Sequence, residues 1–145
     1  MTLVEVSLVR KHVLSAIEQS RLRAKERRQR NADAEQSYRQ FLDEIATPLV
    51  RQLAHALKAE GYPFTVSTPS GSVRLTSDHG RDDYIELVLD TSADVPTVLG
   101  RVHRTRGSRT VSDERPVSPG ASPGAVTDEQ LLAFLMHALE PWLER

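Results

Sequence analysis

The sequence contains no cysteine, which excludes disulfide bonds, thiolate metal sites and cysteine nucleophiles from its chemistry. Aromatic residues are also scarce, at 5% of the chain, whereas charged residues reach 27%. A chain of 145 residues is long enough to bury a core without covalent cross-links. The composition therefore predicts one globular domain, residues 1–145, with a thin hydrophobic core.

Long apolar runs are missing as well, since no stretch approaches the roughly 20 residues that a transmembrane helix needs. The opening MTLVEVSLVRKH has an acidic residue, Glu5, and carries its basic residues after the apolar run, which is the reverse of a signal peptide. We therefore expect a cytoplasmic protein that does not enter membranes.

Motifs that carry chemistry are absent too: the chain has no GxSxG elbow, no HExxH pair and no glycine-rich phosphate loop. The densest group of acid–base side chains is the loop SDHGRDD, which includes Asp78, His79, Asp82 and Asp83. Their spacing matches no metal or catalytic motif, and an acidic loop between strands is usually a solvated turn. We expect no catalytic residue, no metal and no cofactor, and a metal enzyme centred on His79 is the least supported class.

Helical spacing dominates the first 60 residues. Apolar residues recur at steps of three or four as Val6, Val9, Val13 and Ile17, and again as Tyr38, Leu42, Ile45, Leu49 and Leu53. The two stripes share one heptad phase, and the seam between Ser20 and Ala34 is small or polar. This predicts a helical arm over residues 4–60. One continuous helix is favoured because no glycine or proline marks a turn, and a helical hairpin turning at Asn31-Ala32-Asp33 is the alternative.

One proline within this arm and a glycine and a proline just after it predict where the helix is interrupted and where it ends. Pro48 lies inside the second stripe, so we expect a kink or a new helix that begins with Pro48 in its first turn. Gly61 and Pro63 predict that the helix ends near Glu60.

After Pro63 the period becomes alternating, which predicts an antiparallel sheet of about four strands over residues 64–110. Pro69-Ser70-Gly71 marks the first turn. If the third and fourth strands pair, Glu86 faces Arg101 on one side of the sheet. Residues 112–126 are rich in proline, glycine and serine and are predicted to be a loop.

The last element is predicted as a helix over residues 127–143, which begins with a capping box of Thr127 and Gln130. Its apolar face is wider than one side of a four-stranded sheet requires, so part of it is expected to contact a partner. The face comprises Leu131, Leu132, Leu135, Met136, Leu139, Trp142 and Leu143. The whole pattern predicts an α+β fold in which this helix packs on the sheet.

Charge is segregated along the chain although the net charge is only -1. Residues 21–30, RLRAKERRQR, contain six basic residues, and residues 101–109 are also rich in arginine. Such runs suit a polyanion, but aromatic side chains that would stack on bases are missing there, and a solvated helix has the same composition. The candidate polyanion contacts are Arg21, Arg23, Lys25, Arg27, Arg28, Arg30, Arg101, Arg104 and Arg106.

The function that these patterns favour is a non-enzymatic interaction protein, either a homodimer or a subunit of a larger assembly. Its predicted contacts lie on the N-terminal helix and on the C-terminal apolar helix. The candidate interface residues are Val13, Ile17, Tyr38, Phe41, Leu135, Leu139 and Trp142. Nucleic-acid binding through the basic helix 21–30 and the strand 101–109 is the alternative function.

Overall fold

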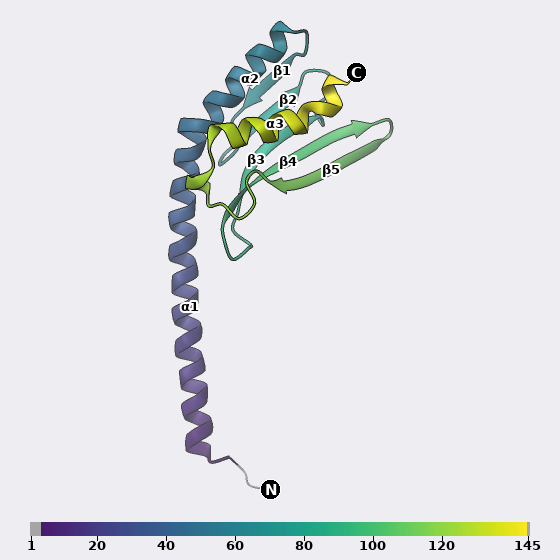
Figure 1. Ribbon diagram of the computed structural model, residues 1–145. Helices are drawn as coiled ribbons and strands as arrows, with labels where there is room; N and C mark the ends of the chain where they lie inside the picture. Colours follow the sequence, from purple (N-terminus) through teal and green to yellow (C-terminus); the bar gives the residue numbers. More distant parts are fainter. Residues whose placement is uncertain (1–3, 145) are drawn as a thin grey trace. The chain divides into compact units, whose positions relative to one another are not determined.

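The computed structural model describes residues 4–144 and is of the predicted α+β class. The chain divides into two compact units, residues 1–33 and residues 34–145. Figure 1 shows the order of the elements along the chain.

One continuous helix, α1 (Val6–Phe41), contains the first stripe and the basic interval, so the hairpin alternative is wrong. No glycine or proline interrupts this segment. A π-helical turn, η1 (Leu42–Ala46), follows directly, and α2 (Thr47–Ala59) begins with proline in its first turn. The π turn lies where a regular helix would bring the Pro48 ring against the carbonyl one turn earlier. The predicted irregularity at Pro48 is thus confirmed.

The end of α2 is also confirmed. Gly61 adopts φ +90°, in the left-handed region that glycine tolerates best. The amide of Tyr62 then donates back to the carbonyl of Leu57 at 2.8 Å, which satisfies a terminal helix carbonyl.

Five strands, not four, form one antiparallel sheet in the order β1-β2-β3-β4-β5. They are β1 (Phe64–Ser67), β2 (Val73–Ser77), β3 (Tyr84–Asp90), β4 (Thr97–Arg106) and β5 (Arg109–Pro116). The additional strand is β5, which occupies the start of the predicted loop 112–126. Every β5 residue is exposed, so the strand lacks the buried alternate positions by which a sequence indicates a strand.

A local signal for β5 was nevertheless present. Gly107 and Ser108 form a two-residue turn between β4 and β5, with Gly107 at φ +64°. A glycine in the first position of such a turn is a hairpin signature. The rest of the predicted loop contains a short 3-10 helix, η2 (Pro123–Ala125).

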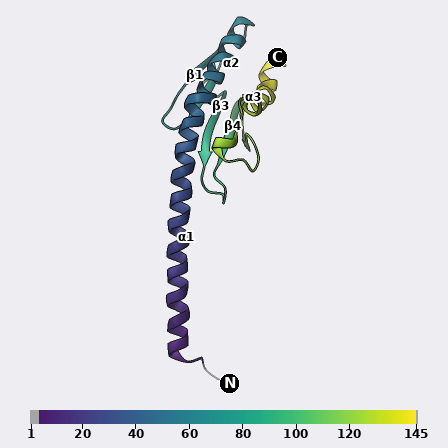
Figure 2. The ribbon, with the colours of Figure 1, turned by 60° about the vertical axis from the view of Figure 1, so that its left-hand side comes forward.

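Helices α2 and α3 (Asp128–Leu143) lie on the same face of the sheet (Figures 1 and 2). The alternate strand residues that face them are buried, including Leu75, Ile85, Leu87 and Val98. Phe134 of α3 packs directly on Gly100 of β4, where a Cβ atom would lie 2.1 Å from the ring. The predicted capping box of Thr127 and Gln130 at the start of α3 is confirmed.

Candidate interaction surfaces

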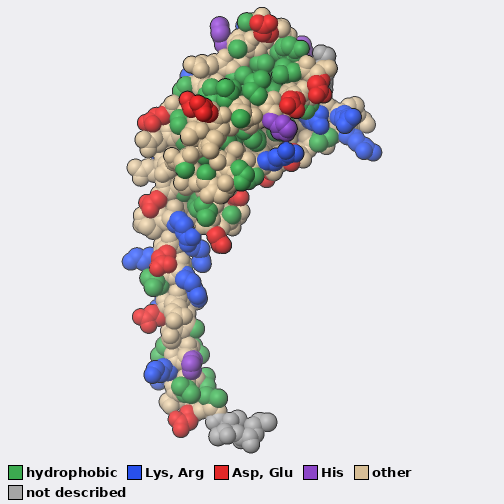
Figure 3. Space-filling model, in the orientation of Figure 1, with side chains coloured by type: hydrophobic (Ala, Val, Ile, Leu, Met, Phe, Trp, Pro, Cys, Tyr) green, Lys and Arg blue, Asp and Glu red, His purple; other side chains and the backbone are tan. Residues whose placement is uncertain are grey.

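The N-terminal part of α1 carries an exposed apolar stripe. Val6, Val9, Val13 and Ile17 follow one another at helical spacing, and their exposed fractions run from 84% at Val6 to 43% at Ile17. Ser20 and Ala24 continue the same line. We call these six residues the N-terminal seam. Figure 3 shows apolar side chains gathered near the beginning of α1 and basic side chains farther along it.

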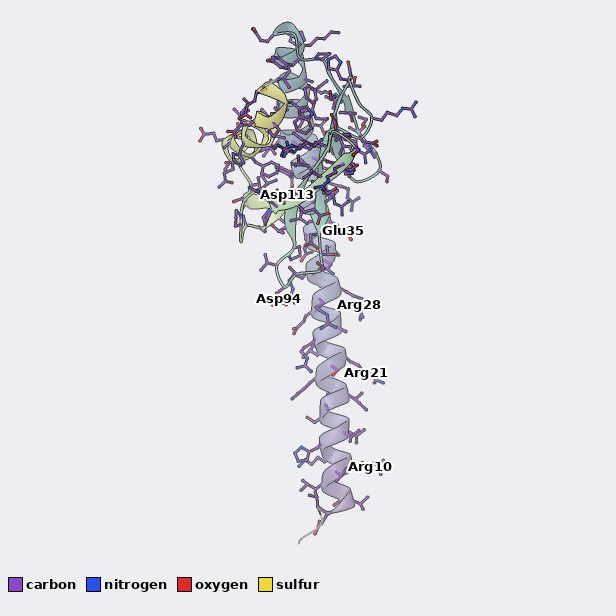
Figure 4. All side chains as sticks on the ribbon, turned by 90° about the vertical axis from the view of Figure 1, so that its right-hand side faces the viewer. Arg10, Arg21, Arg28, Glu35, Asp94 and Asp113 are labelled. Carbon is purple, nitrogen blue, oxygen red and sulfur yellow. The ribbon has the colours of Figure 1, made fainter. Side chains whose placement is uncertain are left out.

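Basic residues of α1 lie on both sides of this seam, and two of them, Arg10 and Arg27, border it directly because they share the heptad positions of Ile17 and Val13. Arg10, Arg21 and Arg28 are separated by about three and two helical turns and so share one flank (Figure 4). Arg23 and Arg27 lie on the opposite flank, and all five side chains are exposed. Lys25 and Arg30 of the predicted polyanion contacts are exposed on the same helix. The apolar seam is therefore bordered by positively charged side chains on both sides.

The other predicted interface residues do not form a surface. Tyr38 and Phe41 at the end of α1 and Leu135, Leu139 and Trp142 of α3 are buried in the core of residues 34–145. On α3 the large apolar side chains that stay exposed are Leu132, at 40%, and Met136, at 41%. We call these two the α3 patch, and Figure 3 shows apolar side chains over the region of α2 and α3. The excess of apolar surface predicted for α3 is thus smaller than its sequence indicated.

Tyr38 is a polar anchor of that core. Its hydroxyl lies 3.0 Å from the carbonyls of both Gly71 and Leu87, so its single proton is shared between two acceptors. Burial raises the pKa of Tyr38, and the negative charge of Glu86 raises it further. The residue predicted to bind a partner therefore connects the end of α1 to the sheet.

The face of the sheet that α2 and α3 leave open is charged, and its charges are paired. Glu86 and Arg101 are opposite each other as predicted. The salt bridges nevertheless join Glu86 to Arg74 at 2.8 Å and Arg101 to Glu114 at 2.6 Å. Arg74 also lies 4.2 Å from the ring centre of Tyr84. Because its acid partner is close, Arg101 is a poorer polyanion contact than the sequence indicated.

At the tip of the β4–β5 hairpin, in contrast to the open face, the charges are not paired with acidic residues in the described part of the chain. Arg106 and Arg109 are direct cross-strand partners, and Arg104 lies on the same face two residues away from Arg106. Among residues 4–144, none of these three arginines makes an ion pair. Figure 3 shows basic side chains at this tip. We call the three residues the arginine tip; all three lie in the predicted basic strand 101–109, although Arg109 was not among the individually predicted contacts.

A groove of about 420 Å³ runs between this hairpin and α3. Its lining is mixed: Val102, Val111, Phe134 and Pro141 are apolar, and Arg104, Asp113, Arg115 and His137 are charged or polar. The three strand arginines that were predicted to form one contact lie on two faces of the sheet. Arg104 and Arg106 are on the face that the helices cover, and Arg101 is on the open face.

The acidic loop 78–83 is held by hydrogen bonds within the fold. The buried Asp83 accepts from the amide of Thr105 at 2.6 Å and from the indole nitrogen of Trp142 at 3.5 Å. Asp78 accepts from the hydroxyl of Thr65 at 2.5 Å. Over residues 4–144, no three His, Asp or Glu side chains converge in an arrangement suited to a metal ion. The contacts of this loop serve to connect β3, β4 and α3.

No helix within residues 4–144 combines the length and the apolar character required to span a bilayer. These features define an α+β protein with a five-stranded antiparallel meander and an extended N-terminal helix. Comparison with protein-family models, with curated proteins and with solved structures gives no match to the chain.

Proposed function

We propose that this chain is a non-enzymatic interaction protein whose N-terminal seam binds a helix of a partner. One observation carries the proposal: between residues 4 and 33, every large apolar side chain is at least 43% exposed. These side chains are Val4, Val6, Leu8, Val9, Val13, Leu14, Ile17 and Leu22. Scattered apolar side chains are normal on a surface, but a stripe at helical spacing is typical of helix packing.

The free energy gained by burying the seam favours binding to a partner. Complete burial of one valine, leucine or isoleucine side chain contributes about 1.5–3 kcal/mol. A helix without tertiary contacts is only marginally stable in water, and most helical stability in proteins comes from packing of its apolar face. A helix bound along the seam would therefore stabilise α1 while removing its apolar side chains from water.

A secondary contact is proposed at the α3 patch. Leu132 and Met136 are adjacent on the surface of α3 because they are four residues apart. Methionine suits a contact of this kind because its flexible thioether adapts to irregular surfaces. Two side chains are too few for an independent interface, so we assign the patch a supporting role.

Site-specific photo-crosslinking in the producing cells tests the proposal. A photoreactive phenylalanine analogue at Ile17, on the seam, is expected to cross-link a protein, and the analogue at Glu18 is expected to cross-link far less. Val13→Glu should abolish the Ile17 product because it places a charge in the seam. Equal labelling from Ile17 and Glu18, or no product from either, would contradict the proposed function.

Nucleic-acid binding is the second candidate, and the arginine tip is the observation that favours it. Three arginines that have no acidic partner among residues 4–144 occupy one face of a hairpin, next to the groove between this hairpin and α3. Clustered cations of this kind bind phosphate groups and release counterions when they do so.

The arginine tip and the salt-bridged Arg101 provide a matched test of the second candidate. Binding of single-stranded DNA and RNA fragments should weaken steeply with salt, and a substitution that removes one phosphate-binding cation should reduce the logarithmic salt slope by about one. Arg104→Gln and Arg106→Gln are expected to weaken binding, whereas Arg101→Gln should have a smaller effect because Glu114 already pairs with Arg101. Absence of binding at low salt would exclude this function.

A further inference from the structure

We propose that the helix bound by the N-terminal seam is α1 of a second copy of this chain, running antiparallel and crossing near residue 15. This inference rests on the proposed function and adds the identity and direction of the partner. It is carried by the two arginine residues at seam positions, Arg10 and Arg27, which parallel pairing places against the same residues of the partner and antiparallel pairing does not.

Parallel pairing brings like charges together. In heptad terms Arg10 and Ile17 share one seam position, and Val13 and Arg27 share the other. In a parallel, in-register dimer each seam residue packs against the same residue of its copy. Arg10 would then face the partner's Arg10, and Arg27 would face the partner's Arg27. Arg23 would also lie beside the partner's Arg28, because flanking positions five residues apart meet across a parallel pair.

Antiparallel pairing about residue 15 removes these arginine pairs from the seam. Residues placed symmetrically about this point lie opposite each other, so Val13 packs on the partner's Ile17 and Ile17 on the partner's Val13. Val6 then faces the partner's Ala24, and Arg10 faces the partner's Ser20. Val13 and Ile17 of each copy therefore form the centre of the interface, and no arginine shares a seam layer with an arginine. One like-charged approach remains on the flank, where Arg10 lies about one residue from the level of the partner's Arg21.

The flanks of this arrangement bring together apolar residues and a pair of opposite charges. Near the crossing point Leu14 meets the partner's Leu14 on one flank, and Ala16 meets the partner's Ala16 on the other. Glu5 and Arg23 are 18 residues apart, which is five helical turns, so they lie on the same flank of the helix. Antiparallel pairing brings Glu5 within about two residues of the level of the partner's Arg23. Opposite charges thus approach each other at both ends of the interface and offset the like-charged approach of Arg10 to the partner's Arg21.

The arrangement assigns a role to the basic interval as well. Because α1 begins at Val6, residues that follow Ala24 extend beyond the end of the partner helix. Arg27 and Arg28 of both copies are then directed to solvent. A shift of the crossing point by half a heptad toward the C-terminus would place Arg10 against the partner's Arg27. The basic residues therefore determine where the interface ends and which register it adopts.

Cysteine cross-linking of the full-length chain tests this geometry without interference, because the natural chain has no cysteine. Val6→Cys and Ala24→Cys protein are prepared separately, mixed and oxidised. Antiparallel pairing predicts disulfide-linked dimers that contain one of each variant. In a parallel dimer these two positions would be about 27 Å apart, and Val6→Cys would instead cross-link to itself. Leu22→Cys, which lies off the seam, is the matched control and should remain unlinked.

Sedimentation of the wild-type chain separates failure of this inference from failure of the proposed function. A dimer that dissociates in the Val13→Glu variant, together with mixed Val6–Ala24 links, supports an antiparallel pair of copies. Self-linked Val6→Cys protein without mixed links would overturn the antiparallel direction. A wild-type chain that is monomeric at high micromolar concentration would overturn self-pairing. Cellular cross-links from Ile17 to a protein of another mass would then still support the proposed function.

Discussion

At the scale of single residues, the contact between Gly100 and Phe134 determines how closely α3 approaches the sheet. A Cβ atom at residue 100 would lie 2.1 and 2.2 Å from two ring atoms of Phe134, well inside contact distance. Glycine is required here by space and not by backbone conformation, since its φ is not in the left-handed region. The α3 helix can therefore pack against β4 only while residue 100 has no side chain.

Gly100→Ala is expected to destabilise the protein by about 1–3 kcal/mol, because the ring or the helix must move to accept the methyl group. The measurement is the urea dependence of unfolding, followed by the fluorescence of the single tryptophan, Trp142. Gly124→Ala is the control, because its added Cβ would lie 3.8 Å from Ser37, an ordinary contact. Equal stability of the two variants would show that Phe134 does not pack on Gly100.

Tyr38 makes stability depend on alkaline pH. Burial, and then the charge of Glu86, raise the pKa of Tyr38 in the folded protein, whereas an unfolded tyrosine ionises near pH 10. At lower pH the phenol is neutral in both states. Above about pH 10 the unfolded state loses the proton first, so the free energy of unfolding falls as pH rises.

The wild-type protein should consequently lose more stability than Tyr38→Phe between about pH 9 and about pH 11. Denaturant unfolding of both proteins across this interval measures the difference. Tyr62 and Tyr84 are present in both proteins, so their ionisation cancels in the comparison. Parallel pH profiles would contradict the burial of the Tyr38 hydroxyl against two carbonyls.

At the scale of elements, β5 is a strand that forms without any buried residue of its own. All eight residues of β5 are exposed, yet the strand pairs with β4 along its length. Glu114 of β5 forms a salt bridge with Arg101 of β4, and Val117, just after the strand, is buried. Backbone hydrogen bonds, a favourable turn and the burial of Val117 thus hold an element that hydrophobic alternation does not reveal.

The arginine tip gives a prediction for this hairpin. Like charges directly opposite each other destabilise an antiparallel pair, and Arg106 is opposite Arg109. Arg109→Glu should therefore stabilise the protein by about 0.2–1 kcal/mol at low salt, and Arg109→Gln should give a smaller gain. The gain should shrink at high salt because the pair is exposed. Thermal or urea unfolding at two salt concentrations tests this, and a loss of stability in Arg109→Glu would contradict the observed register.

At the scale of the whole molecule, the hydrophobic core and the seam that we propose for association belong to different units of the chain. The connected hydrophobic core runs from Tyr38 to Trp142 and contains no residue of the N-terminal seam. The large apolar side chains of the seam, in contrast, are exposed. Folding of residues 34–145 should therefore not require the seam.

Deletion of residues 1–30 is expected to leave the remaining chain folded, with a melting temperature that does not depend on protein concentration. The full-length chain should show a concentration-dependent melting transition if its α1 helices associate, because association stabilises only the folded form. Calorimetry at several concentrations tests both expectations. An unfolded shortened chain would show that residues 1–30 contribute to the core.

The sequence by itself determined the elements whose signals are local. The three- and four-residue spacing from Val6 to Ile17 predicted the helix, Pro48 its irregularity, Gly61 its end, and Thr127 with Gln130 the start of α3. Each of these follows from backbone geometry within one or two turns. The change to an alternating period after Pro63 likewise predicted the antiparallel strands.

Only the tertiary structure decided which surfaces remain free. The seven residues of the predicted apolar face of α3 look alike in the sequence, but packing in the core covers most of them and leaves Leu132 and Met136 exposed. The partner of Arg101 was equally undetermined, because Glu86 and Glu114 both lie opposite it on neighbouring strands. Exposure and charge pairing depend on residues far apart in the chain, and local periodicity does not contain that information.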